Sequence, residues 1–204
     1  MHNIEPYFNW RNLYLAEEDE RSPFFGREYS EVYYTDSIYD HYIHPQWDNI
    51  GSETLFLKIL YADYDDHFAV IEFIGEWNDT LHNDIMTLKR DIIDQLIDEG
   101  INKFILIGEN VLNFHSSDDS YYEEWFEDIE DGWVVLLNFR DHVLNDFKDA
   151  GVDNYFMYGG LMNDFEWGSF RPLQLFQKIE QIVERRFNPD FLLAKWKFIS
   201  YCKV

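Results

Sequence analysis

From residue 54 onward, short apolar runs alternate with segments of helical periodicity, and this alternation constrains the fold more than any other feature of the sequence. Residues 54–60 (TLFLKIL) and 67–75 (HFAVIEFIG) are apolar runs of strand length separated by the polar YADYDD. Such a pair predicts two adjacent strands. Further apolar runs predict strands at 103–108 (KFILIG), 133–139 (WVVLLNF) and 154–158 (NYFMY).

The clearest helical pattern follows the second of these runs. Its apolar positions recur at steps of four, three, four and four, and they are Leu81, Ile85, Leu88, Ile92 and Leu96. Asn78 or Asp79 can cap such a helix, and Gly100 can end it. The spacing therefore predicts one long helix between the second and third strands.

Other helices are predicted between and after the later strands. Residues 121–130 and 141–151 carry apolar positions at helical spacing, and Pro172 suits the first turn of a helix that ends near Phe187. Strands that alternate with helices favour right-handed crossovers onto a mainly parallel or mixed sheet. The predicted fold class is therefore α/β.

Residues 1–52 show neither a sustained helical nor a strand period, and they are rich in aromatic residues. Across the chain, 19% of residues are aromatic, which argues against disorder despite the high charge. We expect an irregular N-terminal extension over 1–52, an α/β domain over 53–187 and a basic C-terminal tail over 188–204. The pattern does not decide whether the tail is an amphipathic helix or an edge strand, or whether the aromatic extension covers a sheet edge or mediates a homodimer.

Charge excludes two classes of partner. Forty acidic and 16 basic residues give a net charge of −24, and this field repels nucleic-acid backbones and anionic membranes. Residues 171–204 carry a local charge of +4, so residues 1–170 carry −28. We expect the basic end to fold back on the acidic body, or else to dock on an acidic partner. A third hypothesis is that the acidic body acts as a decoy for nucleic-acid-binding proteins.

The sequence also bears on the cellular compartment. No apolar run approaches the ~20 residues that a membrane-spanning helix needs, and the first residues lack the basic and apolar regions of a signal peptide. The single cysteine, Cys202, permits no internal disulfide. We therefore expect a cytoplasmic protein that does not insert into a membrane.

Motifs for catalysis or cofactor binding are sparse. Glycine-rich phosphate loops and the G-x-S-x-G nucleophile elbow are both missing, so no cofactor is predicted. The spacing His41-x-x-His44, with Asp36, Asp40 and Asp48 nearby, could hold zinc or another divalent ion. A metal-binding protein or an enzyme that uses these residues is the alternative to a non-catalytic protein.

The order of predicted elements over residues 54–187 resembles a STAS domain, the family of sulfate transporters and anti-sigma factor antagonists. In that family a buried strand leads into an Asp-Ser-Ser-Gly turn whose first serine is phosphorylated in regulatory members. The matching stretch here is His115-Ser116-Ser117-Asp118, so the resemblance places Ser116 at the phosphorylated position. It departs from the motif at His115 and Asp118, and Asp118 and Asp119 would repel a phosphate group.

We therefore predict a non-catalytic interaction or regulatory module of STAS-like shape. It would bind a protein partner through the turn at 114–120, which includes Ser116 and Ser117, and through the helix that follows. The sequence does not exclude an enzyme with a buried carboxylate site, because burial and separation decide such chemistry.

Overall fold

The computed structural model describes residues 4–30 and 32–187. The chain divides into two compact units, one ending at Phe165 and the other beginning at Glu166. The predicted basic tail at 188–204, with Cys202, lies outside the described residues.

A five-stranded mixed sheet organises the first unit, with strands in the order β3-β4-β5-β6-β7. The strands are β3 (Asp48–Asn49), β4 (Leu55–Asp63), β5 (Phe68–Asn78), β6 (Lys103–His115) and β7 (Trp133–Leu137). The first three strands pair antiparallel, whereas β5–β6 and β6–β7 pair parallel. The predicted α/β class with a mixed sheet is confirmed.

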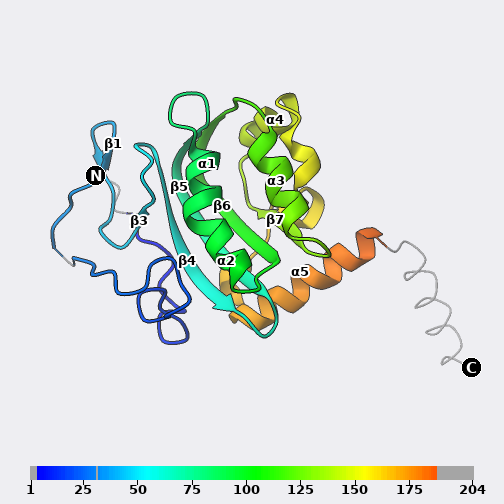
Figure 1. Ribbon diagram of the computed structural model, residues 1–204, viewed down its shortest axis with the longest axis horizontal. Coiled ribbons are helices and arrows are strands. Elements are labelled where there is room, and N and C mark those ends of the chain that lie inside the picture. Colours follow the sequence, from blue (N-terminus) through cyan, green and yellow to red (C-terminus); the bar gives the residue numbers. More distant parts are fainter. Residues whose placement is uncertain (1–3, 31, 188–204) are drawn as a thin grey trace, which may run out of the picture. The chain divides into compact units, whose positions relative to one another are not determined.

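Helices connect the parallel strands, as the sequence predicts. A helical stretch of α1 (Asp84–Leu88), the π-helical turn η1 (Lys89–Ile93) and α2 (Asp94–Asp98) joins β5 to β6. Helix α3 (Ser120–Asp128) joins β6 to β7, and α4 (Asp141–Asp149) follows β7. Figure 1 shows α1, α2 and α3 lying over the sheet. Their apolar side chains share one core with alternate residues of the central strands.

The predicted start of the first helix is wrong by several residues. Helix α1 begins at Asp84, and Leu81, predicted on the apolar face, is 76% exposed. The polar side chains at the end of β5 explain the difference. Asn78 Oδ1 accepts the Leu81 N–H at 2.9 Å, and Asp79 Oδ1 accepts the Ile85 N–H at 2.9 Å. These bonds hold residues 78–83 in turns that compete with helix. The other predicted apolar positions are buried, namely Ile85, Leu88, Ile92 and Leu96.

Two strands are longer than predicted. Strand β5 continues past Gly75 to Asn78, and β6 continues past Gly108 to His115. The two strands stay paired along this length through register shifts at Glu72/Ile74 and Gly75/Glu76. A mixed polar and apolar sequence therefore forms strand here because a neighbouring strand pairs with it.

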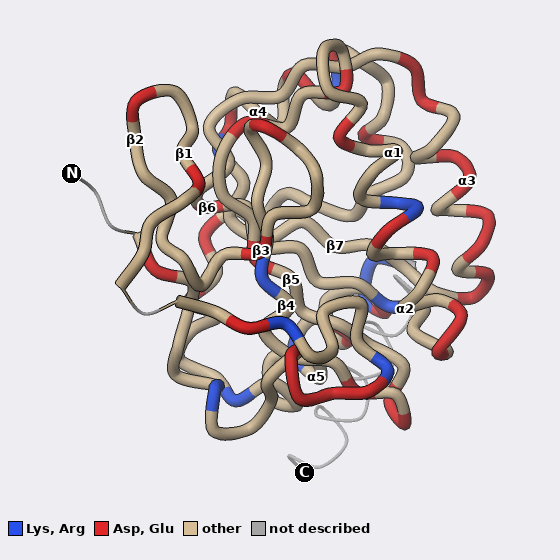
Figure 2. The backbone as a smooth tube through the Cα atoms, turned by 60° about the vertical axis from the view of Figure 1, so that its left-hand side comes forward, with Lys and Arg blue, Asp and Glu red and all other residues tan. Residues whose placement is uncertain are grey.

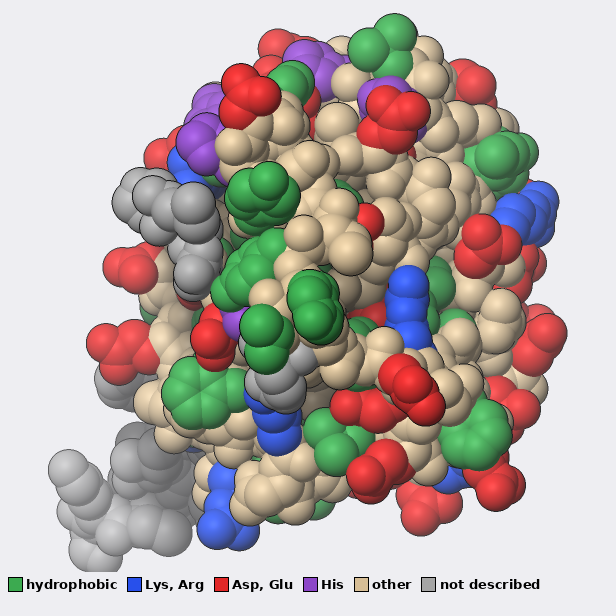
Figure 3. Space-filling view, turned by 90° about the vertical axis from the view of Figure 1, so that its left-hand side faces the viewer, with side chains coloured by type: hydrophobic (Ala, Val, Ile, Leu, Met, Phe, Trp, Pro, Cys, Tyr) green, Lys and Arg blue, Asp and Glu red, His purple; other side chains and the backbone are tan. Residues whose placement is uncertain are grey.

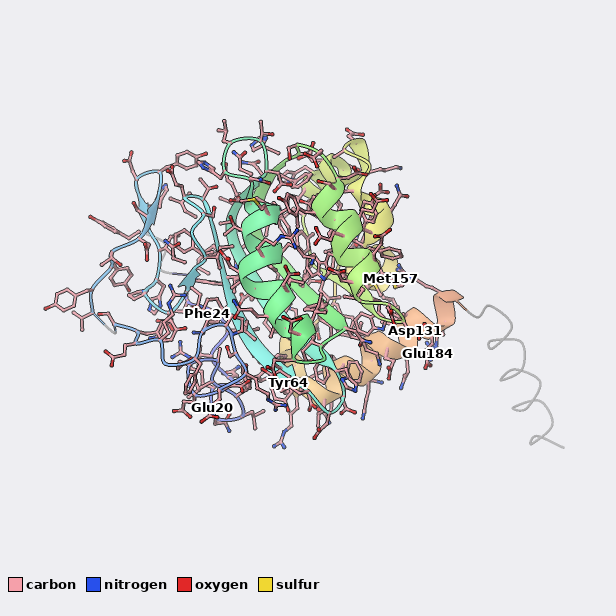
Figure 4. All side chains as sticks on the ribbon, in the orientation of Figure 1. Glu20, Phe24, Tyr64, Asp131, Met157 and Glu184 are labelled. Carbon is pink, nitrogen blue, oxygen red and sulfur yellow. The ribbon has the colours of Figure 1, made fainter. Side chains whose placement is uncertain are left out.

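The predicted strand at 154–158 is wrong. A 3-10 turn, η2 (Val152–Tyr155), occupies its first part, and Met157 forms only an isolated parallel bridge with Val135. Met157 is labelled in Figure 4. The Asn154 side chain donates to the Gly151 carbonyl at 3.0 Å, which favours a turn over an extended chain. A second short turn, η3 (Gly160–Met162), follows.

The N-terminal extension is mostly irregular, as predicted. It contains a small hairpin of β1 (Ser37–Ile38) and β2 (His41–Tyr42), and it supplies β3 to the edge of the sheet beside β4. The part that carries Glu20 and Phe24 lies near the β4–β5 turn (Figure 4), where Tyr64 donates a hydrogen bond to Asp19 at 2.6 Å. The aromatic extension therefore covers the sheet edge at β4.

The second unit contains the turn η4 (Trp167–Ser169) and helix α5 (Pro172–Phe187). The helix begins at the proline that the sequence predicts for its first turn. Among the helices of the described residues, none has both the length and the apolarity needed to cross a bilayer.

Candidate functional site

The serine turn lies where β6 ends, between that strand and α3. Ser116 and Ser117 are both exposed. The Ser116 carbonyl accepts the Thr80 hydroxyl at 2.7 Å, and the His115 carbonyl accepts the Asp79 N–H at 2.8 Å. The turn is thus joined to the segment that leaves β5, at the carboxyl ends of two parallel strands.

The buried carboxylate of Asp79 lies on the core side of this turn. Asp79 accepts hydrogen bonds from Trp77 Nε1 at 3.1 Å, from the Tyr122 hydroxyl at 2.6 Å and from the Ile85 N–H at 2.9 Å. Burial raises the pKa of Asp79 to about 6, although these donors act in the opposite direction. Asp79 therefore fixes the first turns of α1 and α3 against the end of β5.

The two aspartates at the start of α3 have local partners. Asp118 Oδ1 accepts the N–H and the hydroxyl of Ser120, and these bonds lower the pKa of Asp118. Asp119 Oδ2 accepts the Tyr155 hydroxyl at 2.9 Å, which raises the pKa of Tyr155 to about 12. Both carboxylates therefore hold the turn in shape.

A depression of about 370 Å³ lies beside the turn. Its lining comes from the ends of β5 and β6 and from α4, namely Thr80, Phe114, His115, Ser116, Asp146, Asp149 and Ala150. The segment 118–131 adds eight acidic residues and no lysine or arginine. Figure 2 shows the acidic positions spaced along α3. The field around Ser116 is negative and opposes a phosphate group.

The geometry gives no sign of an activated serine nucleophile. Within residues 4–30 and 32–187, neither serine hydroxyl makes a hydrogen bond to an imidazole, although His115 is the sequence neighbour of Ser116. An activated serine needs a base within hydrogen-bond reach. The turn exposes polar groups without assembling that pair.

The proposed metal ligands at His41 and His44 are in different surroundings. His41 is exposed in β2, whereas His44 is buried, with Nε2 3.3 Å from Glu5 Oε1 and Nδ1 accepting the Gln46 N–H at 3.3 Å. Asp48 pairs with Arg27 at 3.0 Å. In the part of the chain that the structure describes, no three His, Cys, Asp or Glu side chains form a group suited to a metal ion. The metal site stays a prediction.

Sequence reasoning missed the support of the turn. It considered Asp79 only as a helix cap, yet the Asp79 carboxylate also binds Tyr122, 43 residues away. A single sequence carries no signal for such a contact, because the partner lies on another element.

No family model matches the chain, and no curated protein matches it. Three solved structures are similar to it over about half its length. SpoIIAA, an anti-sigma factor antagonist in its unphosphorylated form, is 20% identical over 51% of this chain and 88% of that chain, with a TM-score of 0.41. The phosphorylated Bacillus cell fate determinant SpoIIAA is 17% identical over 51% and 91%, with a TM-score of 0.36. A candidate anti-sigma factor antagonist from Thermotoga maritima is 16% identical over 52% and 86%, with a TM-score of 0.37. The chain is similar to each of these three structures over about half of its length.

Proposed function

We propose that the protein is a non-catalytic interaction module that binds a protein partner through the turn at 114–120 and the exposed side of α3. The observation that carries this proposal is the contrast between the two sides of the turn. On the side of the turn that faces the core, Asp79 joins β5, α1 and α3 through buried hydrogen bonds. On the opposite side, Ser116 and Ser117 face solvent.

Such a rigid, exposed turn is suited to binding. A surface that is already ordered loses little conformational entropy when a partner docks. Phe126 on α3 is 52% exposed, and the centroid of its ring lies 6.0 Å from that of Tyr155. It offers a partner an aromatic contact among the acidic side chains of the helix. Glu124 already pairs with Arg90 and Asp128 with Lys89, so a partner with a basic surface would complement the other acidic residues of segment 118–131.

Contact by the unmodified serines fits this electrostatic setting better than phosphorylation. A phosphate group would add about −1.5 to −2 charges at neutral pH. Asp146 and Asp149 line the same depression as Ser116, with no lysine or arginine among the lining residues. The proposal therefore assigns Ser116 and Ser117 to the contact surface itself.

Substitution of Ser116 tests this proposal. Ser116→Glu places a charge and added bulk at the centre of the surface, and Ser116→Ala removes only the hydroxyl. Gln95→Glu is the matched control, because Gln95 is exposed on α2 and gains the same charge. Tagged full-length variants would be compared for the proteins that they retain from native lysate at low and high salt.

We expect Ser116→Glu to lose a partner that survives high salt, whereas Gln95→Glu keeps it. Equal recovery by the parent and by both Ser116 variants would contradict use of the turn. Both Ser116 variants should unfold at the parent temperature, since the Ser116 hydroxyl makes no hydrogen bond within the described residues. The metal site, the acidic decoy and the homodimer stay separate hypotheses, because no specific contact among the described residues favours them.

A further inference from the structure

A second depression of the first unit has no role in the proposal above. It encloses about 700 Å³ between the β1–β2 hairpin, the segment that enters β4 and the turns after β5. Its lining residues are Thr35, Asp36, Ser37, Tyr39, Asn49, Gly51, Ser52, Glu53, Thr54, Phe56, Asn78, Leu81 and His82. This volume is sufficient for a long side chain and its neighbours.

One wall is an exposed aromatic ring held in a fixed position. Tyr39 is 70% exposed at the tip of the hairpin, yet its hydroxyl donates to Glu76 Oε2 at 2.6 Å. Glu76 is 7% exposed and also accepts Asn113 Nδ2 at 2.6 Å on its other oxygen. A satisfied buried carboxylate thus orders the tyrosine and leaves most of its ring accessible.

The charge of the lining is negative. Asp36 and Glu53 contribute carboxylates, and no lysine or arginine is among the lining residues. Asp36 accepts Asn49 Nδ2 at 3.2 Å, which orients that carboxylate. Within the described residues, Glu53 makes no hydrogen bond or ion pair. Negative charge beside an ordered aromatic ring is the combination that attracts a cation through Coulomb and cation–π forces.

We infer that this depression receives an arginine or lysine side chain from a basic segment of a protein partner. The rim favours a protein segment over a small free cation, because Tyr39 and Leu81 expose 70% and 76% of their surfaces beside it. Apolar atoms that flank the cation in a polypeptide would cover them. Figure 3 shows hydrophobic side chains interspersed with acidic ones on this side of the molecule.

The inference rests on the proposed function only in that the occupant is a protein. The two surfaces are separate but adjacent: Asn78, Leu81 and His82 line this depression, whereas Thr80 of the same loop lines the one beside Ser116. One partner could therefore contact both sides of the loop that follows β5.

A binding experiment with a defined probe tests the inference. Capped tetra-arginine peptide would be titrated into the full chain by calorimetry at moderate salt. The test variant is Asp36→Asn with Glu53→Gln. Its control is Asp146→Asn with Asp149→Asn, which removes the same charge beside the serine turn. We expect the test variant to weaken binding about tenfold and the control less than about twofold.

The aromatic wall has its own test. Tyr39→Leu should weaken binding about threefold through loss of the cation–π contact. Because that change also leaves Glu76 without one donor, Leu81→Ser provides a second rim variant with no hydrogen-bonding side chain removed. Leu81→Ser should also weaken binding of the peptide.

Three results would overturn the inference: equal weakening by the control, no effect of the rim variants, or binding of spermidine as tight as that of the peptide. The first would indicate diffuse attraction and the last a small-molecule site. Ser116→Glu should leave peptide affinity unchanged, so failure of this inference and failure of the proposed function are distinguishable.

Discussion

Replacement of Glu72 by glutamine should stabilise the protein at neutral and alkaline pH. Glu72 lies in β5 and is 4% exposed, and its Oε2 accepts one hydrogen bond, from the Tyr7 N–H at 2.8 Å. Burial raises the pKa of Glu72 from 4.5 to about 7, and the charge of Glu109 adds to the rise. The ionised form is therefore disfavoured in the folded state.

The size and sign follow from linkage. Between these two pKa values the folded protein keeps a proton that the unfolded chain has lost, so stability falls as pH rises. Each pKa unit corresponds to about 1.4 kcal/mol, so the full loss is roughly 3 kcal/mol, of which about 2 kcal/mol falls between about pH 5.5 and pH 8. Glutamine cannot ionise, and its side-chain oxygen can still accept the Tyr7 N–H.

Urea denaturation at several pH values measures this effect. The variant should be more stable than the parent at about pH 8, by up to roughly 3 kcal/mol, with the difference shrinking toward pH 5.5. Glu53→Gln, at an exposed carboxylate, is the control and should shift stability by less than about 0.5 kcal/mol. A Glu72→Gln protein that is no more stable than the parent at pH 8 would refute the argument from burial.

Three further substitutions probe the framework of the site. Tyr122→Phe removes the hydroxyl bonded to Asp79 and should cost about 2 kcal/mol in denaturant unfolding; an unchanged midpoint would show that the bond contributes nothing. Gly75 has a φ of +113°, and Gly75→Ala places a Cβ 2.0 Å from the Thr54 carbonyl oxygen. It should lower the free energy of unfolding by more than about 3 kcal/mol. A soluble variant as stable as the parent would contradict this backbone geometry. Lys89→Ala removes a buried ammonium that pairs with Asp94 and with Asp128, the latter at 2.7 Å, and should cost about 3 kcal/mol by thermal unfolding, against a negligible loss for the exposed Gln95→Ala.

The parts of the fold that follow from apolar periodicity could be predicted. Ile85, Leu88, Ile92 and Leu96 recur at helical spacing and are buried, and the runs at 54–60 and 67–75 pair as adjacent strands. Burial of apolar surface is a local property of the pattern, so one sequence is enough to reveal it.

The parts that depend on contacts between distant residues could not be predicted. The turns at 78–83 replace a predicted helical turn because Asn78 and Asp79 accept backbone N–H groups there, and the Asp79 carboxylate is also held by Tyr122 on the distant α3. The end of β6 has a mixed polar and apolar sequence that does not predict a strand. It forms a strand because β5 pairs with it. Tyr39 and Asn113 meet at Glu76 from opposite directions along the chain, each 37 residues away.

The sequence singled out the serine turn as the candidate site, which stays a prediction, but it gave no indication of how the turn is built. The resemblance to STAS domains directed attention to Ser116, and the structure places that residue on an exposed turn after β6. The buried hydrogen bonds that hold the turn, and the acidic depression beside it, come from five separate elements, β5, α1, α3, β6 and α4. Their assembly is a property of the folded chain.

Photo-crosslinking from the turn tests the central claim most directly. A benzophenone amino acid would replace Ser117 in one full-length protein and the exposed Gln95 in another. Irradiation in native lysate should then yield a discrete protein adduct from position 117 that position 95 does not give, and Ser116→Glu should abolish it. Absence of any adduct from position 117, or the same adducts from both positions, would contradict an interaction surface at the serine turn.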